Sequence, residues 1–250
     1  MSMKVLAINS CPQKDKGNTA RFLGPFLDGM RDAGAVVDLV YGRDLMIFPC
    51  CGNLNCTIKT SVKCIQFDDM EWLRPKMCQA DILVLASPRY CDGAVMPDGF
   101  TGPMRALLDK LKTHEQPCIE LLEGSPGRIP RENVNLKKIV LVSNQGFLEI
   151  DDLDPVLTHV KAFCINSYPE LSGTIFQPYY VFLRCGFEEG TSILDIPGSA
   201  RNAGFLLMQE IKMSVKEDKI VSRELKQGDN SIRTSVVGEE SFNDRQKRRG

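Results

Sequence analysis

The chain has 250 residues, of which 43% are hydrophobic and 25% charged, an ordinary composition for a folded domain with a sizeable core. Its formal net charge of -1 gives no electrostatic reason to expect a nucleic acid or an anionic membrane as a partner. No apolar run reaches the roughly 20 residues of a membrane-spanning helix, and the opening "MSMKVLAINS" is too short and strand-like for a secretory signal. We therefore expect a cytoplasmic protein whose ten cysteines are mostly thiols or metal ligands rather than disulfides.

The N-terminal part of the chain alternates strand and helix patterns. The run "KVLAIN" (4–9) is compact and followed by turn residues, so it predicts a buried strand. The next stretch predicts a helix in which Asn18 or Thr19 caps the N-terminus and Gly34 ends the helix in a left-handed conformation. The run "VVDLVYG" (36–42) then predicts a second strand.

The rest of the chain continues this alternation. Further helices are predicted over 68–80, 102–112, 151–168 and 199–215, and further strands over 81–87, 137–146 and 174–185. Pro178 lies in the last of these strands and weakens it or places it at a sheet edge. Five strands that alternate with helices predict an α/β fold, in which helices cover both faces of a parallel sheet.

The sequence predicts one domain followed by a tail. Residues 1–215 form the domain and include a cysteine-rich segment at 49–67. Residues 216–250 are dense in charge and poor in periodicity, which predicts a tail that is flexible or ordered only against a partner.

The loop "NSCPQKDKGNT" (9–19) follows the first predicted strand. In an open α/β sheet, ligands bind beyond the carboxyl ends of the strands. The loop has neither the GxGxxG pattern of dinucleotide folds nor the GxxxxGK[ST] pattern of nucleotide triphosphatases. It offers small hydrogen-bonding side chains, a glycine and the start of a helix, which together favour a bound phosphate. Helix capping by the same side chains is the alternative interpretation.

Three segments of the chain together resemble a known family. They are the loop at 9–19, the cysteine segment that ends in "CIQFDDM" (64–70), and "ASPRY" (86–90) after the third predicted strand. The chain resembles the flavodoxin-like NAD(P)H-dependent FMN reductases, and within them the iron–sulfur flavoproteins, over about residues 3–215. The resemblance implies a flavodoxin-like, doubly wound, five-stranded parallel sheet with helices on both faces.

The resemblance also implies an FMN site built from three loops that follow strand ends. The implied residues are Ser10, Lys16, Asn18 and Thr19 around the phosphate, Pro88, Arg89 and Tyr90 beside the isoalloxazine ring, and Asn144, Gly146 and Phe147 completing the pocket. Because FMN carries the hydride chemistry itself, no catalytic side chain is implied. We expect His114 and His159 to be structural or solvated, since neither has a paired nucleophile.

Four cysteines are the candidate metal ligands. In the branch that the chain resembles, two residues separate the first three cysteine ligands. Here Cys50 and Cys56 match the outer pair and Cys64 matches the last ligand, but Asn53 occupies the middle position and Cys51 is an extra thiol. A [4Fe–4S] cluster usually takes four thiolates. An iron–sulfur cluster, a zinc ion and metal-free thiols all stay open on this pattern.

The sequence therefore predicts an FMN-dependent NAD(P)H oxidoreductase that passes electrons to a quinone, a flavin or another acceptor. The alternatives are a non-enzymatic iron–sulfur/FMN electron carrier between partner proteins, and a ligand-sensing protein that keeps only the fold. The expected partners are a small-molecule acceptor or a redox protein, with no nucleic acid and no membrane, and a homo-oligomer is expected from the resemblance. The segment at 91–104 is longer than in similar proteins and is a candidate lid or subunit contact.

Overall fold

The structure is a computed structural model of the whole chain. It describes residues 2–53, 55–58, 64–88, 100–111, 115–122, 125–130, 132–144, 154–167, 169–177, 196–214, 222–224 and 233–235.

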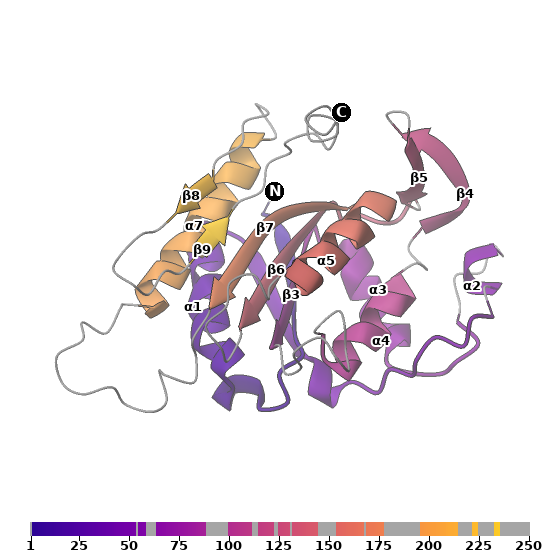
Figure 1. Cartoon of the computed structure of the whole chain (residues 1–250), viewed down its shortest axis with the longest axis horizontal. Coiled ribbons are helices and arrows are strands. Elements are labelled where there is room, and N and C mark those ends of the chain that lie inside the picture. Colours follow the sequence, from indigo (N-terminus) through magenta and orange to yellow (C-terminus); the bar gives the residue numbers. More distant parts are fainter. Residues whose placement is uncertain are drawn as a thin grey trace.

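A parallel sheet forms the centre of the molecule (Figure 1). Its strands are β1 (Lys4–Asn9), β2 (Val36–Tyr41), β3 (Ile82–Pro88), β6 (Lys138–Asn144) and β7 (Glu170–Gln177). They lie in the order β2-β1-β3-β6-β7, and each neighbouring pair is parallel. The predicted doubly wound, five-stranded α/β sheet is therefore confirmed.

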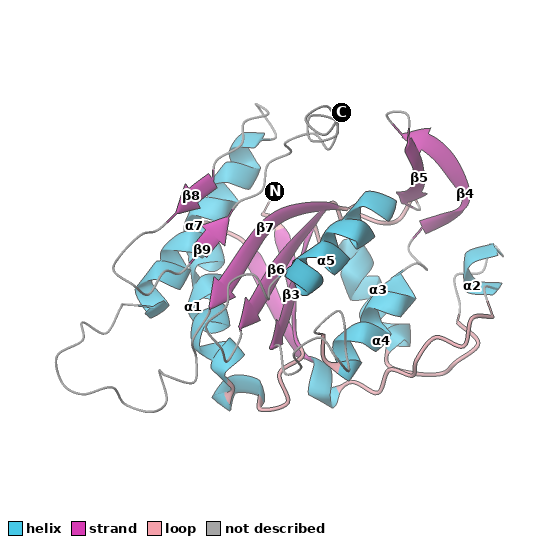
Figure 2. Ribbon diagram, viewed as in Figure 1, coloured by secondary structure: helices cyan, strands magenta, loops and turns pink. Residues whose placement is uncertain are grey.

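Helices cover both faces of this sheet, as Figure 2 shows. The helices are α1 (Asn18–Asp32), α2 (Asn55–Ile58), α3 (Met70–Gln79), α4 (Gly102–Leu111), α5 (Asp154–Asn166) and α7 (Ile196–Ser214), with short 3-10 helices η1 (Lys14–Lys16) and η2 (Gly42–Asp44). Side chains of α1 and α7 share one core cluster with the sheet, and those of α3, α4 and α5 share the other. Within the described residues, no helix has the length and apolarity needed to cross a membrane.

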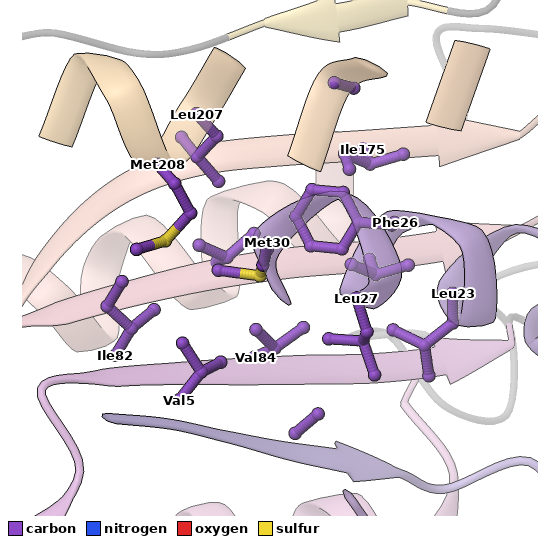
Figure 3. Close-up of a cluster of buried hydrophobic side chains, with 14 of the residues drawn as sticks. Val5, Leu23, Phe26, Leu27, Met30, Ile82, Val84, Ile175, Leu207 and Met208 are labelled. Carbon is purple, nitrogen blue, oxygen red and sulfur yellow. The ribbon is translucent and has the colours of Figure 1, made fainter. Parts of the chain in front are cut away.

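The two cores follow from the alternation of side chains along each strand. In β3, Ile82 and Val84 face the core shared with α1 and α7, while Leu83 and Leu85 face the other core. This strand is buried along its whole length, which explains its continuous apolar sequence. Figure 3 shows the first core, in which the labelled side chains of α1 and α7 pack over those of the strands.

Helices α1 and α7 approach each other closely because glycines face the contact. A Cβ placed on Gly29 would lie 1.8 Å from the backbone oxygen of Arg201, and one placed on Gly204 would lie 2.0 Å from the backbone oxygen of Phe26. The Arg201 guanidinium also donates to both carboxylate oxygens of Asp32, at 2.6 and 3.0 Å. The close contact leaves room for hydrogen at these two positions and for nothing larger.

Several predicted boundaries need correction. The fifth strand begins at Glu170, four residues before the predicted start, and is described as far as Gln177; Pro178 and the rest of the predicted strand lie outside the described residues. Helix α1 begins at Asn18 with Gly17 as its N-cap, rather than the predicted Asn18 or Thr19, and has no side-chain cap because glycine has no side chain. Gly34 does adopt the expected left-handed conformation, with a φ of 87°.

Three strand pairings were not predicted from the sequence. β4 (Glu115–Leu122) and β5 (Ser125–Pro130) form an antiparallel pair outside the main sheet. From the C-terminal segment, β9 (Arg233–Ser235) pairs antiparallel with β7, and β8 (Ser222–Glu224) pairs with β9. The prediction of a flexible or partner-ordered tail over 216–250 stays a prediction.

Candidate functional site

Buried polar side chains gather where β1, β3 and β6 end. These side chains are Asn9, Ser10, Thr19, Ser87, Thr101, Ser143 and Asn144. The strand register places Asn9 beside Ala86, Ser87 beside Ser143, and Pro88 beside Asn144. Because polar groups are costly to bury, such a collection at the ligand-binding edge of a parallel sheet marks the candidate site.

The start of α1 is fixed over the end of β6. The Thr19 hydroxyl donates to the Asn144 side-chain oxygen at 2.6 Å, and both residues are fully buried. Two residues predicted from separate loops are thus brought into direct contact. Thr19 is the second residue of α1, so its backbone N–H has no acceptor within the helix and can be offered to a ligand.

Ser10 is also held by the sheet. Its backbone N–H and its hydroxyl both donate to the Ala86 carbonyl oxygen, at 2.8 and 3.2 Å. The side chain is 1% exposed. These two hydrogen bonds fix Ser10, the first residue after β1, to β3, so the loop begins at a defined position.

Asn9 is a functional candidate that the sequence reasoning missed. Its side-chain oxygen accepts the Cys11 N–H at 2.9 Å. Its side-chain nitrogen is buried and has no hydrogen-bond partner among the described residues. A buried donor that lacks an acceptor is costly, so this N–H₂ group at the base of the loop fits an anion. An asparagine as the last strand residue before a glycine-containing loop was the available signal.

The loop itself is tightly folded around Cys11. A Cβ on Gly17 would lie 2.3 Å from the Cys11 sulfur, so the thiol occupies the space beside the helix N-cap. Lys14 adopts a positive φ of 51°, and the Gly17 N–H donates to its carbonyl oxygen at 3.2 Å. This turn directs the chain into α1, whose first backbone N–H groups have no acceptor within the helix.

The basic side chains around the loop differ in whether their charge is free to pair with a phosphate. The Lys14 ammonium lies 2.5 Å from an Asp44 carboxylate oxygen, so its charge is already paired. Lys16 and Arg21 are exposed, and Asn18 is half-buried as the first residue of α1. Lys16 is thus the better placed of the two loop lysines to meet a phosphate.

The loop after β1 is also tied to the segment after β2. The Arg43 guanidinium donates to the Pro12 carbonyl oxygen at 2.6 Å. A Cβ on Gly42 would lie 3.2 Å from the Ser10 Cα, so η2 packs closely on the loop. The chain that leads to the cysteine segment therefore starts directly beside the candidate phosphate site.

Part of the predicted ring-binding region lies outside the described residues. Pro88 is the last residue of β3 and is buried. Arg89, Tyr90, Gly146 and Phe147 are among the residues that the structure does not describe, as is most of the segment at 91–104. Their predicted contacts with a flavin stay predictions. His159, in contrast, packs edge-on against Phe100, with ring centroids 5.7 Å apart, which fits its expected structural role.

The four cysteines of the cysteine-rich segment differ in exposure. Cys50 and Cys51 are exposed, whereas Cys56 and Cys64 are half-buried. Asn53 accepts the Asn55 N–H at 3.4 Å and so serves the start of α2. Within the described residues, which include all four cysteines, no three ligating side chains lie together as a metal site.

Among the scattered cysteines whose side chains the structure describes, Cys11 and Cys78 are buried and Cys164 is half-buried. Burial raises the pKa of the Cys164 thiol to about 12, and the nearby Glu170 carboxylate adds to the increase. Burial likewise raises the pKa of Cys78, against the opposing effect of Arg74. Both are therefore protonated thiols near neutral pH and poor nucleophiles.

Comparisons with known proteins agree with this architecture. The model of a family described as NADPH-dependent FMN reductase matches residues 3–171. An iron-sulfur flavoprotein from Methanocaldococcus jannaschii is 32% identical over 91 residues, which are 36% of this chain and 46% of that protein. The match thus spans less than half of that relative's length.

Solved structures share the fold at low identity. The NAD(P)H:quinone oxidoreductase from Methanothermobacter marburgensis has a TM-score of 0.56 at 15% identity, covering 83% of this chain and 100% of that one. An FMN-dependent NADH-azoreductase from Bacillus anthracis, solved in complex with FMN, has a TM-score of 0.54 at 9% identity, covering 84% of this chain and 99% of that one.

Proposed function

Because the chain belongs to the NADPH-dependent FMN reductase family, we propose that it binds FMN at the carboxyl edge of the sheet and oxidises NAD(P)H. The electrons pass through the bound FMN to a quinone, a flavin or another small acceptor. When bound, FMN supplies the hydride-accepting chemistry. The chain's own residues bind the phosphate, orient the ring and exclude water.

The phosphate is held by the loop between β1 and α1. The observation that carries this proposal is the buried Asn9 side-chain nitrogen, which has no partner among the described residues. It provides a donor at the base of the loop, and the first backbone N–H groups of α1, at Asn18 and Thr19, provide donors above it. Lys16 adds an exposed positive charge, while Ser10 positions the loop through its bonds to Ala86.

The ring is placed along the ends of β3 and β6. Pro88 and Asn144 are neighbours in the strand register, and the Thr19–Asn144 hydrogen bond fixes their edge to the phosphate loop. Arg89, Tyr90, Gly146 and Phe147 follow these two strands in the sequence and complete the proposed pocket. No side-chain acid or base is assigned, because the hydride passes between nicotinamide and flavin.

The test exchanges one atom of Asn9. Asn9→Asp keeps the oxygen that accepts the Cys11 N–H and replaces the unpartnered N–H₂ with a second, negatively charged oxygen. We expect FMN affinity to fall by about a hundredfold or more, since a buried donor becomes a charge that repels the phosphate. Affinity for riboflavin, which has no phosphate, should change little.

The two affinities are measured by quenching of flavin fluorescence, with NADH and NADPH oxidation in the presence of a quinone measured in parallel. Circular dichroism checks that the variant is folded. Equal loss of FMN and riboflavin binding in a folded variant would place Asn9 outside the phosphate site. A wild-type protein that binds no FMN would remove the proposal altogether.

A second candidate function is electron carriage by FMN together with an iron–sulfur cluster on Cys50, Cys51, Cys56 and Cys64. The name of the curated relative supports it, and the described arrangement of the thiols does not, because no three ligands come together. No step of the proposed reaction passes through a cluster. Iron quantitation after anaerobic purification tests it, and a protein that oxidises NAD(P)H without iron contradicts it.

A further inference from the structure

The backbone of Lys14 has a conformation that lysine rarely adopts. Its φ is 51°, and it is the one non-glycine residue with a positive φ among those that the structure describes. This conformation carries a steric cost that glycine escapes and that asparagine and aspartate tolerate better. Such residues persist where their surroundings hold them in place, and they cluster at binding sites. Lys14 lies in the loop assigned to the FMN phosphate, where a glycine would form the same turn without this cost.

Backbone hydrogen bonds close the turn on both sides of Lys14. Its N–H donates to the Cys11 carbonyl oxygen at 3.0 Å, and its carbonyl oxygen accepts the Gly17 N–H at 3.2 Å. The Lys16 N–H donates to the Gln13 carbonyl oxygen at 3.0 Å. These bonds use backbone groups alone, and every residue except proline brings both of the groups used at position 14. They therefore do not explain why a lysine is there.

The side chain of Lys14 reaches from the loop to the segment that follows β2. Its ammonium lies 2.5 Å from an Asp44 carboxylate oxygen and 6.0 Å from the centre of the Tyr41 ring. An opposite charge and an aromatic face thus both attract it. Tyr41 is the last residue of β2, and Asp44 is the last residue of η2. Lys14 therefore connects its loop to two elements from another part of the chain.

Each residue of η2 contacts the phosphate loop. The contacts are Gly42 with the Ser10 Cα, Arg43 with the Pro12 carbonyl oxygen, and Asp44 with the Lys14 ammonium. The first two contacts reach backbone atoms of the loop. Of the three, only the contact with Asp44 needs a particular side chain in the loop. The lysine at position 14 thus completes the attachment of the loop to η2.

The shape of the loop matters because the proposed donors to the phosphate lie on it and directly after it. Helix α1 begins at Asn18, immediately after Gly17, and its first N–H groups bind an anion only when they converge on it at hydrogen-bonding distance. An ion pair that holds the loop before the ligand arrives lowers the ordering cost of binding. The positive charge of Lys14 then serves the shape of the loop rather than the phosphate.

We propose that Lys14 and Asp44 are positioning residues, which hold the loop after β1 in the shape that binds the FMN phosphate. This inference rests on the proposed function and extends it to η2. The ion pair offsets the steric cost of the positive φ at Lys14, which accounts for a lysine where glycine fits more easily.

A direct contact between Lys14 and the phosphate predicts the opposite response to one substitution. Asp44→Asn removes the carboxylate that pairs with Lys14. If the Lys14 ammonium bound the phosphate itself, freeing it and removing a nearby negative charge would both raise FMN affinity. If the ion pair positions the loop, the same substitution lowers FMN affinity. The sign of the change therefore separates the two roles.

Asp38 provides a matched control. Its side chain is 52% exposed, as is that of Asp44, and it pairs with Lys76 at 2.6 Å. This second ion pair joins β2 to α3 rather than to the phosphate loop. Asp38→Asn thus removes the same charge from an equally exposed carboxylate that is paired with a lysine.

Fluorescence quenching measures the FMN and riboflavin affinities of the full chain, at low salt and at about 1 M salt. At low salt, Asp44→Asn and Lys14→Gly should each bind FMN about fivefold more weakly than the wild type, the upper range for one exposed ion pair. Riboflavin affinity should not change. The loss in Lys14→Gly is expected although glycine removes the backbone cost. Asp38→Asn should match the wild type, and high salt should reduce the effect of Asp44→Asn.

Exchange of the two charges tests the ion pair itself. Lys14→Asp should weaken FMN binding, and adding Asp44→Lys should restore most of the affinity, with circular dichroism confirming the fold of each variant. A double variant no better than Lys14→Asp would overturn the inference.

Three further results would contradict the positioning role. They are FMN binding by Asp44→Asn that equals or exceeds that of the wild type, an equal loss in Asp38→Asn, and an equal loss of riboflavin binding. A wild-type chain that binds no FMN would instead remove the proposed function, and the inference with it.

Discussion

The contact between α1 and α7 allows a sharp test with two glycines on one helix. A Cβ on Gly29 would lie 1.8 Å from the Arg201 backbone oxygen and 2.9 Å from the Phe205 nitrogen, whereas a Cβ on Gly24 meets nothing within 4 Å. Both residues lie inside α1. Replacing Gly29 by alanine raises the helix propensity by about 1 kcal/mol. The gain at Gly24 is smaller, because Gly24 precedes Pro25 and proline disfavours the α conformation of a preceding residue that carries a Cβ.

The magnitude at Gly29 follows from the atoms that would collide. They belong to the backbone of α7, so no side chain can rotate away, and the helices must separate by about 1.5 Å to restore van der Waals contact. Separation would loosen the packing of Phe26 and Met208, which are fully buried in this core. Overpacking of this kind costs about 3 kcal/mol. Gly29→Ala should thus be less stable than both the wild type and Gly24→Ala.

Urea unfolding followed by circular dichroism measures both free energies, with the flavin content held equal in all samples. The two variants should differ by about 2–3 kcal/mol in the free energy of unfolding, since the overpacking occurs only at Gly29 and the alanine at Gly24 gains less than the full propensity. For a domain of this size, that corresponds to roughly 10 °C in melting temperature. If Gly29→Ala is as stable as Gly24→Ala, the close approach of α1 and α7 is wrong and with it the placement of α7 on this face of the sheet.

Two further predictions concern the candidate site and the start of α3. Gly17→Ala should weaken FMN binding about tenfold or more, because its methyl group collides with the Cys11 sulfur. Adding Cys11→Ala to the same chain should restore much of the affinity. Fluorescence titration measures FMN binding of both variants, and a double variant that binds no better than Gly17→Ala would contradict the collision. The hydrogen bonds from the Met46 N–H and the Trp72 indole lower the pKa of the Asp69 carboxyl below its ordinary value of 3.8. The ionised Asp69 carboxylate therefore stabilises the fold fully above pH 3.8, and this stabilisation is lost as the pH falls through the lowered pKa. Tryptophan fluorescence in urea at several pH values should show this loss in the wild type and not in Asp69→Asn; equal pH dependence of the two proteins would refute it.

The sequence alone determined the layout of the strands and helices. β1 lies at the predicted residues, and β2, β3 and β6 lie within one or two residues of the predicted limits. The reason is that short, continuous apolar runs between turn residues indicate buried strands when helices separate them. Gly34 ends α1 in a left-handed conformation because glycine adopts it without steric cost. The position of the candidate site followed in the same way, since parallel strands bring their following loops to one edge.

Only the tertiary structure decided which side chains meet there. The Thr19 hydroxyl donates to Asn144, 125 residues away, and the Ser10 hydroxyl donates to the Ala86 carbonyl oxygen, 76 residues away. The unpartnered nitrogen of Asn9 likewise becomes visible only when its surroundings are known. Hydrogen-bond partners so distant in sequence are set by strand order and register, and local propensities carry no information about either.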